Sequence, residues 1–509
     1  MPTLSPRRTA CVLALLVFGL TGPANRLIST TQAQEAPPAA TEEWQSLSIG
    51  RARVGYIRST TSTDVVEGKN RLKSRTETAM TIARFGQKVK LKITMETEET
   101  PEGEWLGFNS VMENPPSAAT RTEGIIQGDQ LLLTTTVNGK ATQKKMKWDT
   151  ALKSPAWQDR MMREQPMKPG DVRKLESFEP QFSRPMTVTI KALDPEEITL
   201  QDGTRKTFAK VAVSQSLDPK TIQYSYTDDA LKTVMTRTSM LGTEMVTWAV
   251  SKEEALKELS GEDVDLAIAT LVRTGKIERS LETRKVVYKV SLADDDPAKY
   301  LAEGPTQSIR RISPNTVELT VTSIVPPETS AEKAEAADAR YLGSNRFLQS
   351  DDELVVKFAN EAVPADAQPW GAAQSMEKWV HQKVKDKNFS TLMASAAEVA
   401  KTLSGDCTEH ACLLAAMCRA KKIPARIVVG LMYVPRDSAF GGHMWTEVYI
   451  NGVWVPVDGT LGRGRVGADH IKFLDASFDD ADAMDGLAAF VPVVSALGQM
   501  RIEVGAVEH

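Results

Sequence analysis

A cysteine stands at the start of a predicted helix, in the stretch Ser404-Gly405-Asp406-Cys407-Thr408-Glu409. Asp406 can act as the N-cap, and Glu409, three residues further on, completes the pattern of a capping box. Cys407 then occupies the first helical position, where unpaired N–H groups and the positive end of the helix dipole favour a thiolate over a thiol. Because the thiolate is the nucleophilic form of cysteine, Cys407 is the candidate nucleophile of the chain.

A base and an acid follow on a predicted β-hairpin. Asn451-Gly452 separates two β-rich runs, a pattern typical of a type I′ turn. With these two residues in the turn, His443 and Asp458 lie on one face as diagonal neighbours, with Cβ atoms about 7–8 Å apart. The other face is apolar and is expected to pack on the core; it comprises Met444, Thr446, Val448, Ile450, Val453, Val455 and Val457.

A cysteine, a histidine and an aspartate are the groups that acyl transfer through a thiol requires. The thiolate attacks an amide carbonyl, the imidazole moves protons, and the carboxylate orients the imidazole and stabilises its cation. The helix that begins at Cys407 and the hairpin that carries His443 and Asp458 must therefore pack against each other. The hypothesis further requires a sulfur that a substrate can reach.

Three motifs of this region, taken together and in this order, resemble the transglutaminase-like core. They are Gly-Asp-Cys at a helix start, His-x-Trp-x-Glu-Val on a strand and Trp-x-Pro-Val-Asp on the next strand. The resemblance covers roughly residues 341–460 and implies a papain-like α+β fold, in which the helix of the cysteine packs on the sheet that carries the other two residues. It implies Cys407 as nucleophile, His443 as base and Asp458 as the third member.

The sequence departs from the family pattern at a few positions. Met444 stands where many relatives have alanine, and Gly459 where proline is common. Animal transglutaminases have an upstream tryptophan that supports the oxyanion, and neither Trp370 nor Trp379 lies in a motif that establishes the match. The expected oxyanion hole therefore consists of the Cys407 backbone N–H and a second donor that the sequence does not identify.

Other residues compete for these roles. His410 lies one helical turn from Cys407, but it sits at a helix end that disfavours imidazolium and lacks an orienting carboxylate at an evident spacing. Glu447 shares a face with Asp458 but lies farther from His443 along the strand. An acidic run could suggest calcium, but it does not fit an EF-hand loop, and a solvated helix face is the preferred interpretation; the run is Asp475, Asp479, Asp480, Asp482 and Asp485.

Composition and the N-terminus bound the function. The chain has 509 residues and a net charge of −4, and no basic stripe indicates nucleic-acid binding. Arg7 and Arg8 precede an apolar run from Ala10 to Leu20, which predicts a secretory signal cleaved after Ala33, with an uncleaved anchor as the alternative. Periplasmic or extracellular localisation follows, with no membrane span after cleavage. The remaining cysteines, Cys407, Cys412 and Cys418, share one predicted helix and cannot pair within it.

The fold class expected is α+β, with a papain-like core at the C-terminus preceded by a large antiparallel β-rich region of one or two sheets. The predicted segments are a signal peptide (1–33), a flexible lead-in (34–43), the β-rich region (44–325), a polar, alanine-rich linker (326–340) and the catalytic domain (341–509). Within the β-rich region one helix is expected from Ser251 to about Leu259, with Ser251 and Glu254 as its capping box.

Two functions of different classes remain. One is hydrolysis or acyl transfer on protein or peptide amides through a Cys407 acyl-enzyme, without a cofactor or metal. Hydrolysis is preferred because nothing in the sequence marks an amine-binding tunnel. The other is a non-catalytic binding or structural protein of the cell envelope that retains the core. The β-rich region contains no cluster of histidine, cysteine or carboxylate with catalytic spacing, so a scaffold or binding role is the simpler interpretation there.

Overall fold

The computed structural model describes residues 41–137, 139–181, 183–240, 243–257, 259, 265, 270–328, 335–391, 393–478 and 496–509. The predicted signal peptide and most of the lead-in lie outside these residues. The chain is an α+β protein with two compact units. One unit contains Ala83–Val89 and Asp265–His509, and the other contains Lys90–Val264 together with the described residues that precede position 83.

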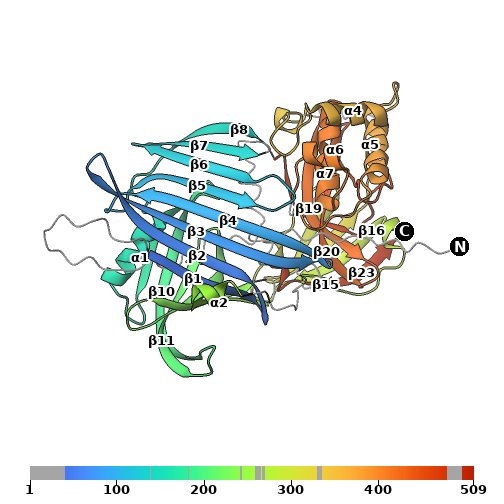
Figure 1. Ribbon diagram of the computed structural model, residues 1–509. Helices are drawn as coiled ribbons and strands as arrows, with labels where there is room; N and C mark the ends of the chain where they lie inside the picture. Colours follow the sequence, from blue (N-terminus) through green and yellow to red (C-terminus); the bar gives the residue numbers. More distant parts are fainter. Residues whose placement is uncertain are drawn as a thin grey trace. The chain divides into compact units, whose positions relative to one another are not determined.

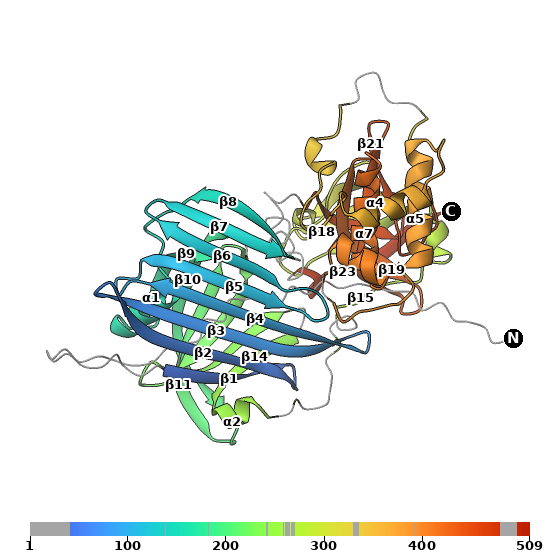
Figure 2. The same ribbon diagram turned by 45° about the horizontal axis from the view of Figure 1, so that its top comes forward.

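The second unit is built on one antiparallel sheet of fourteen strands, which confirms the large antiparallel β region (Figure 2). The strand order is β8-β7-β6-β5-β4-β3-β2-β1-β14-β13-β12-β11-β10-β9. Its strands are β1 (Thr41–Ile49), β2 (Ala52–Val66), β3 (Lys69–Arg84), β4 (Gln87–Glu99), β5 (Trp105–Glu113), β6 (Thr120–Gln127), β7 (Gln130–Val137), β8 (Lys140–Lys147), β9 (Val172–Glu179), β10 (Arg184–Thr199), β11 (Arg205–Gln215), β12 (Asp218–Thr227), β13 (Thr233–Met240) and β14 (Thr243–Val250).

Among the described residues, two helices accompany this sheet. Helix α1 (Pro155–Glu164) begins after Ser154, whose hydroxyl oxygen accepts a hydrogen bond from the Trp157 backbone N–H at 3.1 Å. Helix α2 (Lys252–Ala255) begins where the sequence predicts, with Ser251 as N-cap. It ends at Ala255, four residues before the predicted end.

In its described residues, the first unit contains two further sheets and four helices (Figure 1). The five-stranded sheet has the order β15-β20-β19-β22, with β21 paired to β20, and the four-stranded sheet has the order β17-β18-β16-β23. The strands are β15 (Val272–Arg273), β16 (Lys285–Ser291), β17 (Gln307–Ser313), β18 (Thr316–Thr322), β19 (Ala425–Val434), β20 (Ala439–Ile450), β21 (Val453–Val457), β22 (His470–Ala476) and β23 (Arg501–Glu508). The helices are α4 (Glu353–Ala362), α5 (Pro369–Lys383), α6 (Ala396–Thr402) and α7 (Cys407–Ala420), and the 3₁₀ turns are η1 (Ser280–Glu282), η2 (Pro297–Lys299) and η3 (Ala339–Tyr341).

This division differs from the predicted boundary at residues 326–340. Strand β23, near the end of the chain, pairs with β16, so the strands between residues 285 and 322 belong to the same unit as the C-terminal core. The described parts of the predicted linker also pack on the core: the Asn451 amide donates to the Pro327 carbonyl at 2.9 Å, and the Tyr449 hydroxyl donates to the Glu335 carbonyl at 2.7 Å.

Helix α7 lies at the centre of the first unit. All its residues from Cys407 to Arg419 are buried, as expected of a helix surrounded by protein on every side. Helices α4, α5 and α6 and the apolar faces of β19 and β20 form one core cluster with it. The buried Arg419 guanidinium donates to the carbonyls of Ala425, Ser477 and Gly343, which provides partners for its charged N–H groups. Among the described residues, no helix is both long and apolar enough to span a bilayer.

Candidate functional site

The start of α7 is formed as its sequence predicts. The Asp406 carboxylate accepts a hydrogen bond from the Thr408 backbone N–H at 2.8 Å, and the Glu409 carboxylate accepts one from the Asp406 backbone N–H at 2.9 Å, which confirms the capping box. Cys407 is the first helical residue. Burial and the adjacent Asp406 charge raise the pKa of Glu409 well above its ordinary value.

Cys407 is buried, with 0% of its surface exposed. The structure therefore differs here from what the enzymatic hypothesis requires, because a substrate cannot reach the sulfur in this conformation. Cys412 and Cys418 are buried free thiols too, and burial raises the pKa of both far above the ordinary value. These two residues are inert core thiols, as their positions within the helix predict.

The β20–β21 hairpin has the predicted register. Tyr449 pairs with Trp454 and Thr446 with Val457, and Asn451 and Gly452 both have positive φ angles (51° and 87°) as a type I′ turn requires. The ladder ends at Val457, so Asp458 follows it directly. The Thr446 hydroxyl donates to the Ala411 carbonyl of α7 at 3.0 Å, and this bond ties the hairpin to the helix.

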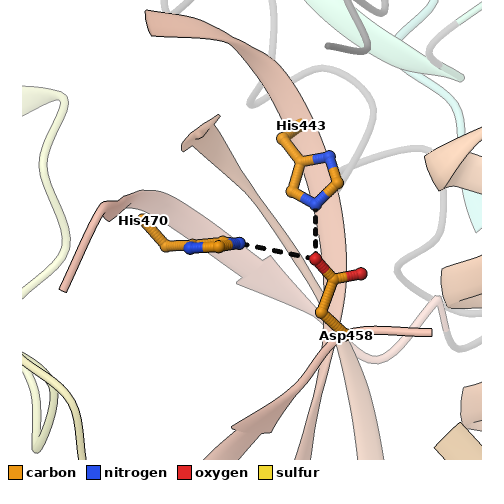
Figure 3. Close-up of side chains that lie close together, drawn as sticks. All are labelled: His443, Asp458 and His470. Atoms are coloured by element: carbon orange, nitrogen blue, oxygen red, sulfur yellow. Dashed lines mark hydrogen bonds and ion pairs between the residues drawn. The ribbon is translucent and has the colours of Figure 1, made fainter. Parts of the chain in front are cut away.

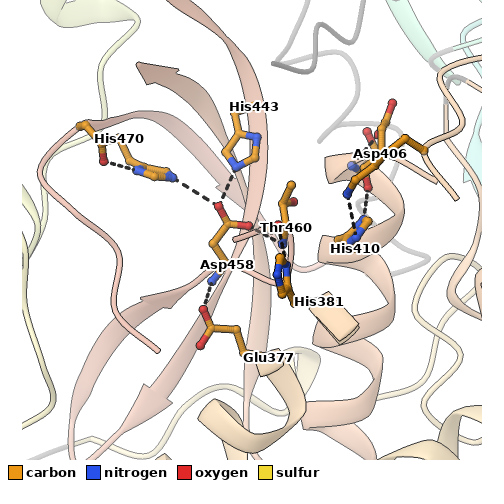
Figure 4. A network of polar contacts seen from close by, with 11 residues as sticks. Glu377, His381, Asp406, His410, His443, Asp458, Thr460 and His470 are labelled. Atoms are coloured by element: carbon orange, nitrogen blue, oxygen red, sulfur yellow. Dashed lines mark hydrogen bonds and ion pairs between the residues drawn. The ribbon is translucent and has the colours of Figure 1, made fainter. Parts of the chain in front are cut away.

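The hairpin brings the predicted base and acid together. His443 Nε2 lies 2.9 Å from Asp458 Oδ2, and both residues are about 1% exposed (Figure 3). Burial opposes the charge on Asp458, but the two imidazoles that contact it outweigh this effect and lower its pKa well below the ordinary range. Figure 4 shows the start of α7, marked by Asp406 and His410, on the side of His443 away from His470.

The other ring nitrogen of His443 has no hydrogen-bond partner. Within the described part of the chain, Nδ1 is buried and unpaired, although a buried polar atom without a partner costs about 1–3 kcal/mol. When Nε2 donates its proton to Asp458, Nδ1 carries the lone pair of the neutral ring. Asp458 thus selects the tautomer in which Nδ1 can accept a proton.

Asp458 binds a second histidine, which the sequence analysis did not identify. His470 Nε2 lies 3.4 Å from Asp458 Oδ2, and His470 Nδ1 lies 2.9 Å from Asp469 Oδ1. Burial disfavours the His470 cation, but the carboxylates of Asp469 and Asp458 outweigh it and raise the pKa of His470 to about 9. His470 is therefore an imidazolium at neutral pH, with its ring centroid 5.5 Å from that of His443.

A close approach of strands positions His470. Gly430 on β19 is paired with His443 on β20, and β19 is paired on its other side with β22, which His470 begins. A Cβ atom at Gly430 would lie 1.9 Å from the Ile471 carbonyl oxygen and 2.8 Å from the Trp445 ring. Glycine is therefore required for these strands to pack as they do. The Trp445 ring also contacts both histidines, with centroids 6.1 Å from His443 and 5.3 Å from His470.

Two further groups hold Asp458. Its Oδ1 accepts a hydrogen bond from the Thr460 backbone N–H at 2.8 Å, and its own backbone N–H donates to Glu377 of α5 at 3.3 Å. Burial and the neighbouring Asp458 charge raise the pKa of Glu377 to about 8, so this carboxyl group is protonated at neutral pH. Glu377 was also missed, because its place on α5 gives no local signal of a contact with residue 458.

The competing residues are used elsewhere. His410 is within hydrogen-bonding distance of the Asp406 and Val384 carbonyls, and burial and the Lys387 ammonium lower its pKa to about 4. It is a neutral structural histidine at physiological pH. Glu447 forms ion pairs with Arg426 at 2.6 Å and Lys472 at 2.8 Å.

The acidic run is described only in part. Asp475 lies on strand β22, where it pairs with Arg426 at 2.9 Å and Lys472 at 2.7 Å, so the predicted helix face is wrong for this residue. The other four acidic residues of the run lie outside the described residues. Trp379 stacks on Phe358, with centroids 4.6 Å apart, and Trp370 packs on the core. Neither contact identifies an oxyanion donor.

An arginine distant in sequence pairs with the N-cap of α7. Arg84 lies in the segment Ala83–Val89 of this same unit, and its guanidinium lies 2.7 Å from Asp406 Oδ2. It also donates to the Thr391 carbonyl at 2.8 Å. Both partners of this ion pair are almost fully buried, at 3% and 0% side-chain exposure. Arg84 thereby balances the negative charge next to Cys407.

One group of side chains could hold a metal ion by distance alone. One ligand atom from each of His443, Asp458 and His470 lies within 4.8 Å of the other two. In this arrangement both imidazole Nε2 atoms contact one carboxylate oxygen and act as donors to it. The contacts therefore fit a proton-bearing network, and a metal would have to displace those protons.

The comparisons with known proteins agree with the core. Residues 356–459 match the model of the Transglutaminase-like superfamily. This range contains Cys407, His443 and Asp458. The first unit, which includes these residues, therefore carries a core of the transglutaminase-like superfamily. No curated protein matches the chain.

Several solved structures show a weaker likeness. A candidate cysteine protease from Cytophaga hutchinsonii is 18% identical, with a TM-score of 0.29 over 45% of this chain and 89% of the other. A β-barrel-like protein with a domain of unknown function, from Brucella abortus, is 11% identical, with a TM-score of 0.31 over 42% and 96%. The periplasmic domain of TgpA from Pseudomonas aeruginosa, bound to ethylmercury, is 16% identical, with a TM-score of 0.22 over 36% and 91%.

Proposed function

We propose that the protein is a thiol-dependent enzyme that cleaves or transfers acyl groups of protein or peptide amides, with Cys407 as nucleophile, His443 as base and Asp458 as orienting acid. One observation carries the proposal: Asp458 holds Nε2 of His443, while Nδ1 is buried and unpaired within the described residues. A ring in this state can accept the proton of a thiol, and a buried nitrogen without such a task is costly.

The proposed reaction has two stages. In the first, Nδ1 of His443 takes the Cys407 proton, the sulfur bonds to the amide carbonyl carbon, and the C–N bond breaks as the imidazolium protonates the leaving amine. In the second, His443 deprotonates a water molecule or an amine, which attacks the thioester and releases Cys407. Water yields an acid and an amine yields a new amide. We favour water, because nothing in the sequence marks an amine-binding tunnel.

The burial of Cys407 favours a second candidate, a non-catalytic binding or structural protein that retains the core. The two candidates predict different thiol chemistry. An enzyme must open to expose Cys407 as a reactive thiolate, whereas a structural core keeps it as inert as Cys412 and Cys418. Those two cysteines are internal references, because burial disfavours their thiolates.

The test is alkylation of the full chain with iodoacetamide, with each cysteine quantified by peptide mass spectrometry. The enzyme hypothesis predicts that Cys407 reacts at least about tenfold faster than the two references and already reacts well below pH 8. Its rate should reach a plateau at high reagent concentration, because opening then limits the reaction. His443→Asn should shift this reactivity to higher pH. Equal, slow labelling of all three cysteines would refute the enzyme and support the structural protein.

Acyl transfer can be tested with p-nitrophenyl acetate, which would acetylate Cys407 and release p-nitrophenolate. A mass increase of one acetyl group on Cys407, absent from Cys407→Ala, is expected. Decay of the adduct to acetate in buffer supports hydrolysis, and transfer to an added primary amine supports amide formation. We also propose that the protein is exported, from the predicted signal at residues 1–33. The N-terminal sequence of the protein recovered from the producing cells tests this.

A further inference from the structure

The unit built on the fourteen-stranded sheet contains a cavity of about 340 Å³, within the range of about 300–1,000 Å³ typical of small-molecule sites. Strands β3 and β4 line one side, strands β10 and β11 line another, and α1 contributes a third wall. In the sheet β4 and β10 are separated by seven other strands, so the sheet must curl for both to line one cavity. Figures 1 and 2 show α1 and β9–β11 behind the broad face of β1–β8.

Most of the lining is apolar and deformable. It includes six methionines, and also Ile93, Phe178, Val188, Val211 and Val213; the methionines are Met80, Met95, Met162, Met167, Met186 and Met245. Methionine is unbranched and polarisable, so methionine-rich walls adapt to flexible apolar ligands. A flexible hydrocarbon chain matches this lining better than a rigid polar molecule does.

Among the described residues, the indole N–H of a lining tryptophan has no hydrogen-bond partner. Trp105 lines the cavity and is 3% exposed, and its indole Nε1 is buried without a hydrogen bond to any described residue. Edge-on contacts with Trp148 and Phe178 hold the ring, with centroids 6.1 and 6.5 Å away. An indole N–H can only donate, so its natural partner is a hydrogen-bond acceptor on a ligand.

The charges of the lining determine which acceptor fits. Asp159 and Glu179 both line the cavity, and burial raises the pKa of each to about 7. Of the two cations in the lining, Lys210 is paired with Glu196 at 2.6 Å, and Arg163 is balanced by Asp159 and the nearby Glu43. Each cation in the lining therefore already has an acidic neighbour, and no further cation of the lining is left to stabilise a ligand carboxylate. At alkaline pH Asp159 and Glu179 are ionised and repel a ligand carboxylate.

We propose that this cavity binds a flexible acyl chain whose ester or amide carbonyl accepts a hydrogen bond from Trp105 Nε1. The apolar walls enclose the chain, the indole N–H binds the uncharged carbonyl oxygen, and the acidic groups exclude free fatty-acid anions. The site is separate from the Cys407 core and does not depend on the proposed activity.

The test compares three ligands of one chain length at a pH near 8, below their aggregation thresholds: methyl laurate, laurate and dodecane. Binding to the full chain is measured by displacement of a fluorescent fatty-chain probe. Methyl laurate should bind at least about tenfold more tightly than laurate. In protein labelled with ¹⁵N-tryptophan, the indole N–H signal that is absent from Trp105→Phe should move when methyl laurate binds.

Trp105→Phe keeps an aromatic ring and removes the donor. It should weaken methyl laurate about five- to tenfold and leave dodecane unchanged, because dodecane has no acceptor. Val188→Trp, which fills the cavity, should abolish binding of both. Equal binding of laurate and methyl laurate, an unmoved Trp105 signal, or unchanged binding in Val188→Trp would each overturn the proposal. If Trp105→Phe does not fold, the indole signals of the other eight tryptophans are assigned by substituting each of them in turn. The one signal left unassigned then belongs to Trp105, and its response to methyl laurate in the native chain tests the proposal.

Discussion

His470→Gln tests whether a permanent cation acts on the proposed catalytic histidine. His470 donates to Asp458 Oδ2 and is held charged by Asp469 and Asp458. Glutamine can still donate a hydrogen bond to Asp458 but carries no charge. The substitution therefore removes the imidazolium beside His443 while it leaves the hydrogen-bonding role of the side chain available.

The size of the effect follows from the geometry. The two ring centroids are 5.5 Å apart, and at an effective dielectric constant of about 20 two like unit charges at that distance repel by about 3 kcal/mol. In the variant Asp469 keeps its negative charge, which acts in the same direction. Loss of the His470 cation should therefore make a positive charge on the His443 ring less unfavourable by about 3 kcal/mol.

The measurement is the pH titration of ring ¹³C signals in protein labelled at histidine. The sequence has five histidines, so single substitutions can assign every signal. In the native chain His470 should lose its proton near pH 9 and His410 should gain one only near pH 4. His381→Gln is the matched control, because His381 contacts the Thr460 carbonyl at 2.9 Å and makes no described contact with Asp458. Loss of the His470 proton near neutral pH in the native chain would refute the permanent cation. Identical ring ¹³C shifts of His443 in the native chain and in His470→Gln at pH 7 would show that the charge of His470 is fully screened.

Three other substitutions test the supports of the site. Glu377→Gln should remove a pH dependence of stability, because the pKa of Glu377 is raised from 4.5 to about 8 in the folded state. The stability of the native protein should therefore fall as pH rises through this window, by up to about 1.4 kcal/mol per pH unit. Denaturation of both proteins at a series of pH values tests this, and parallel stability curves would show that the carboxyl is unperturbed. Arg84→Met leaves the Asp406 carboxylate buried without its cation and should lower the free energy of unfolding by about 3–5 kcal/mol. The double variant Arg84→Met/Asp406→Asn should regain most of this stability, because the buried charge is removed as well. Equal losses in both variants would contradict the ion-pair explanation. Gly430→Ala should lower the free energy of unfolding by more than about 1–3 kcal/mol and disturb the His470 titration. Gly304→Ala is the control and should change thermal stability little, because a Cβ atom there meets nothing within 4 Å. Unchanged stability of Gly430→Ala would exclude the close approach of strands.

The features that local sequence determines were predicted correctly. The capping box of Asp406 and Glu409 and the turn at Asn451-Gly452 each involve residues within a few positions of one another, and their chemistry permits few conformations. Once the turn is known, the alternation of a strand places His443 and Asp458 on one face. The hydrogen bond between them is the direct consequence of that register.

The features that depend on pairing between distant segments were not predictable. His470 reaches Asp458 only because β22 pairs with β19 and Gly430 lets the strands approach, and the sequence around residue 470 contains no sign of this partner. The division of the chain into units likewise depends on β23 pairing with β16 across more than two hundred residues, which local sequence does not indicate. Arg84 and Asp406, which form an ion pair, lie even farther apart in sequence.

Burial explains why these distant residues matter chemically. In a site closed to water, a charge is stable only next to an opposite charge or well-placed hydrogen-bond donors and acceptors. Asp469 and Asp458 supply two negative charges, and His470 supplies one fixed positive charge, so the network has room for one more cation. Protonation of His443 by a thiol would supply that cation and complete the balance. The arrangement of the two aspartates and two histidines therefore favours the ion pair that thiol chemistry requires, at a place where water could not stabilise it.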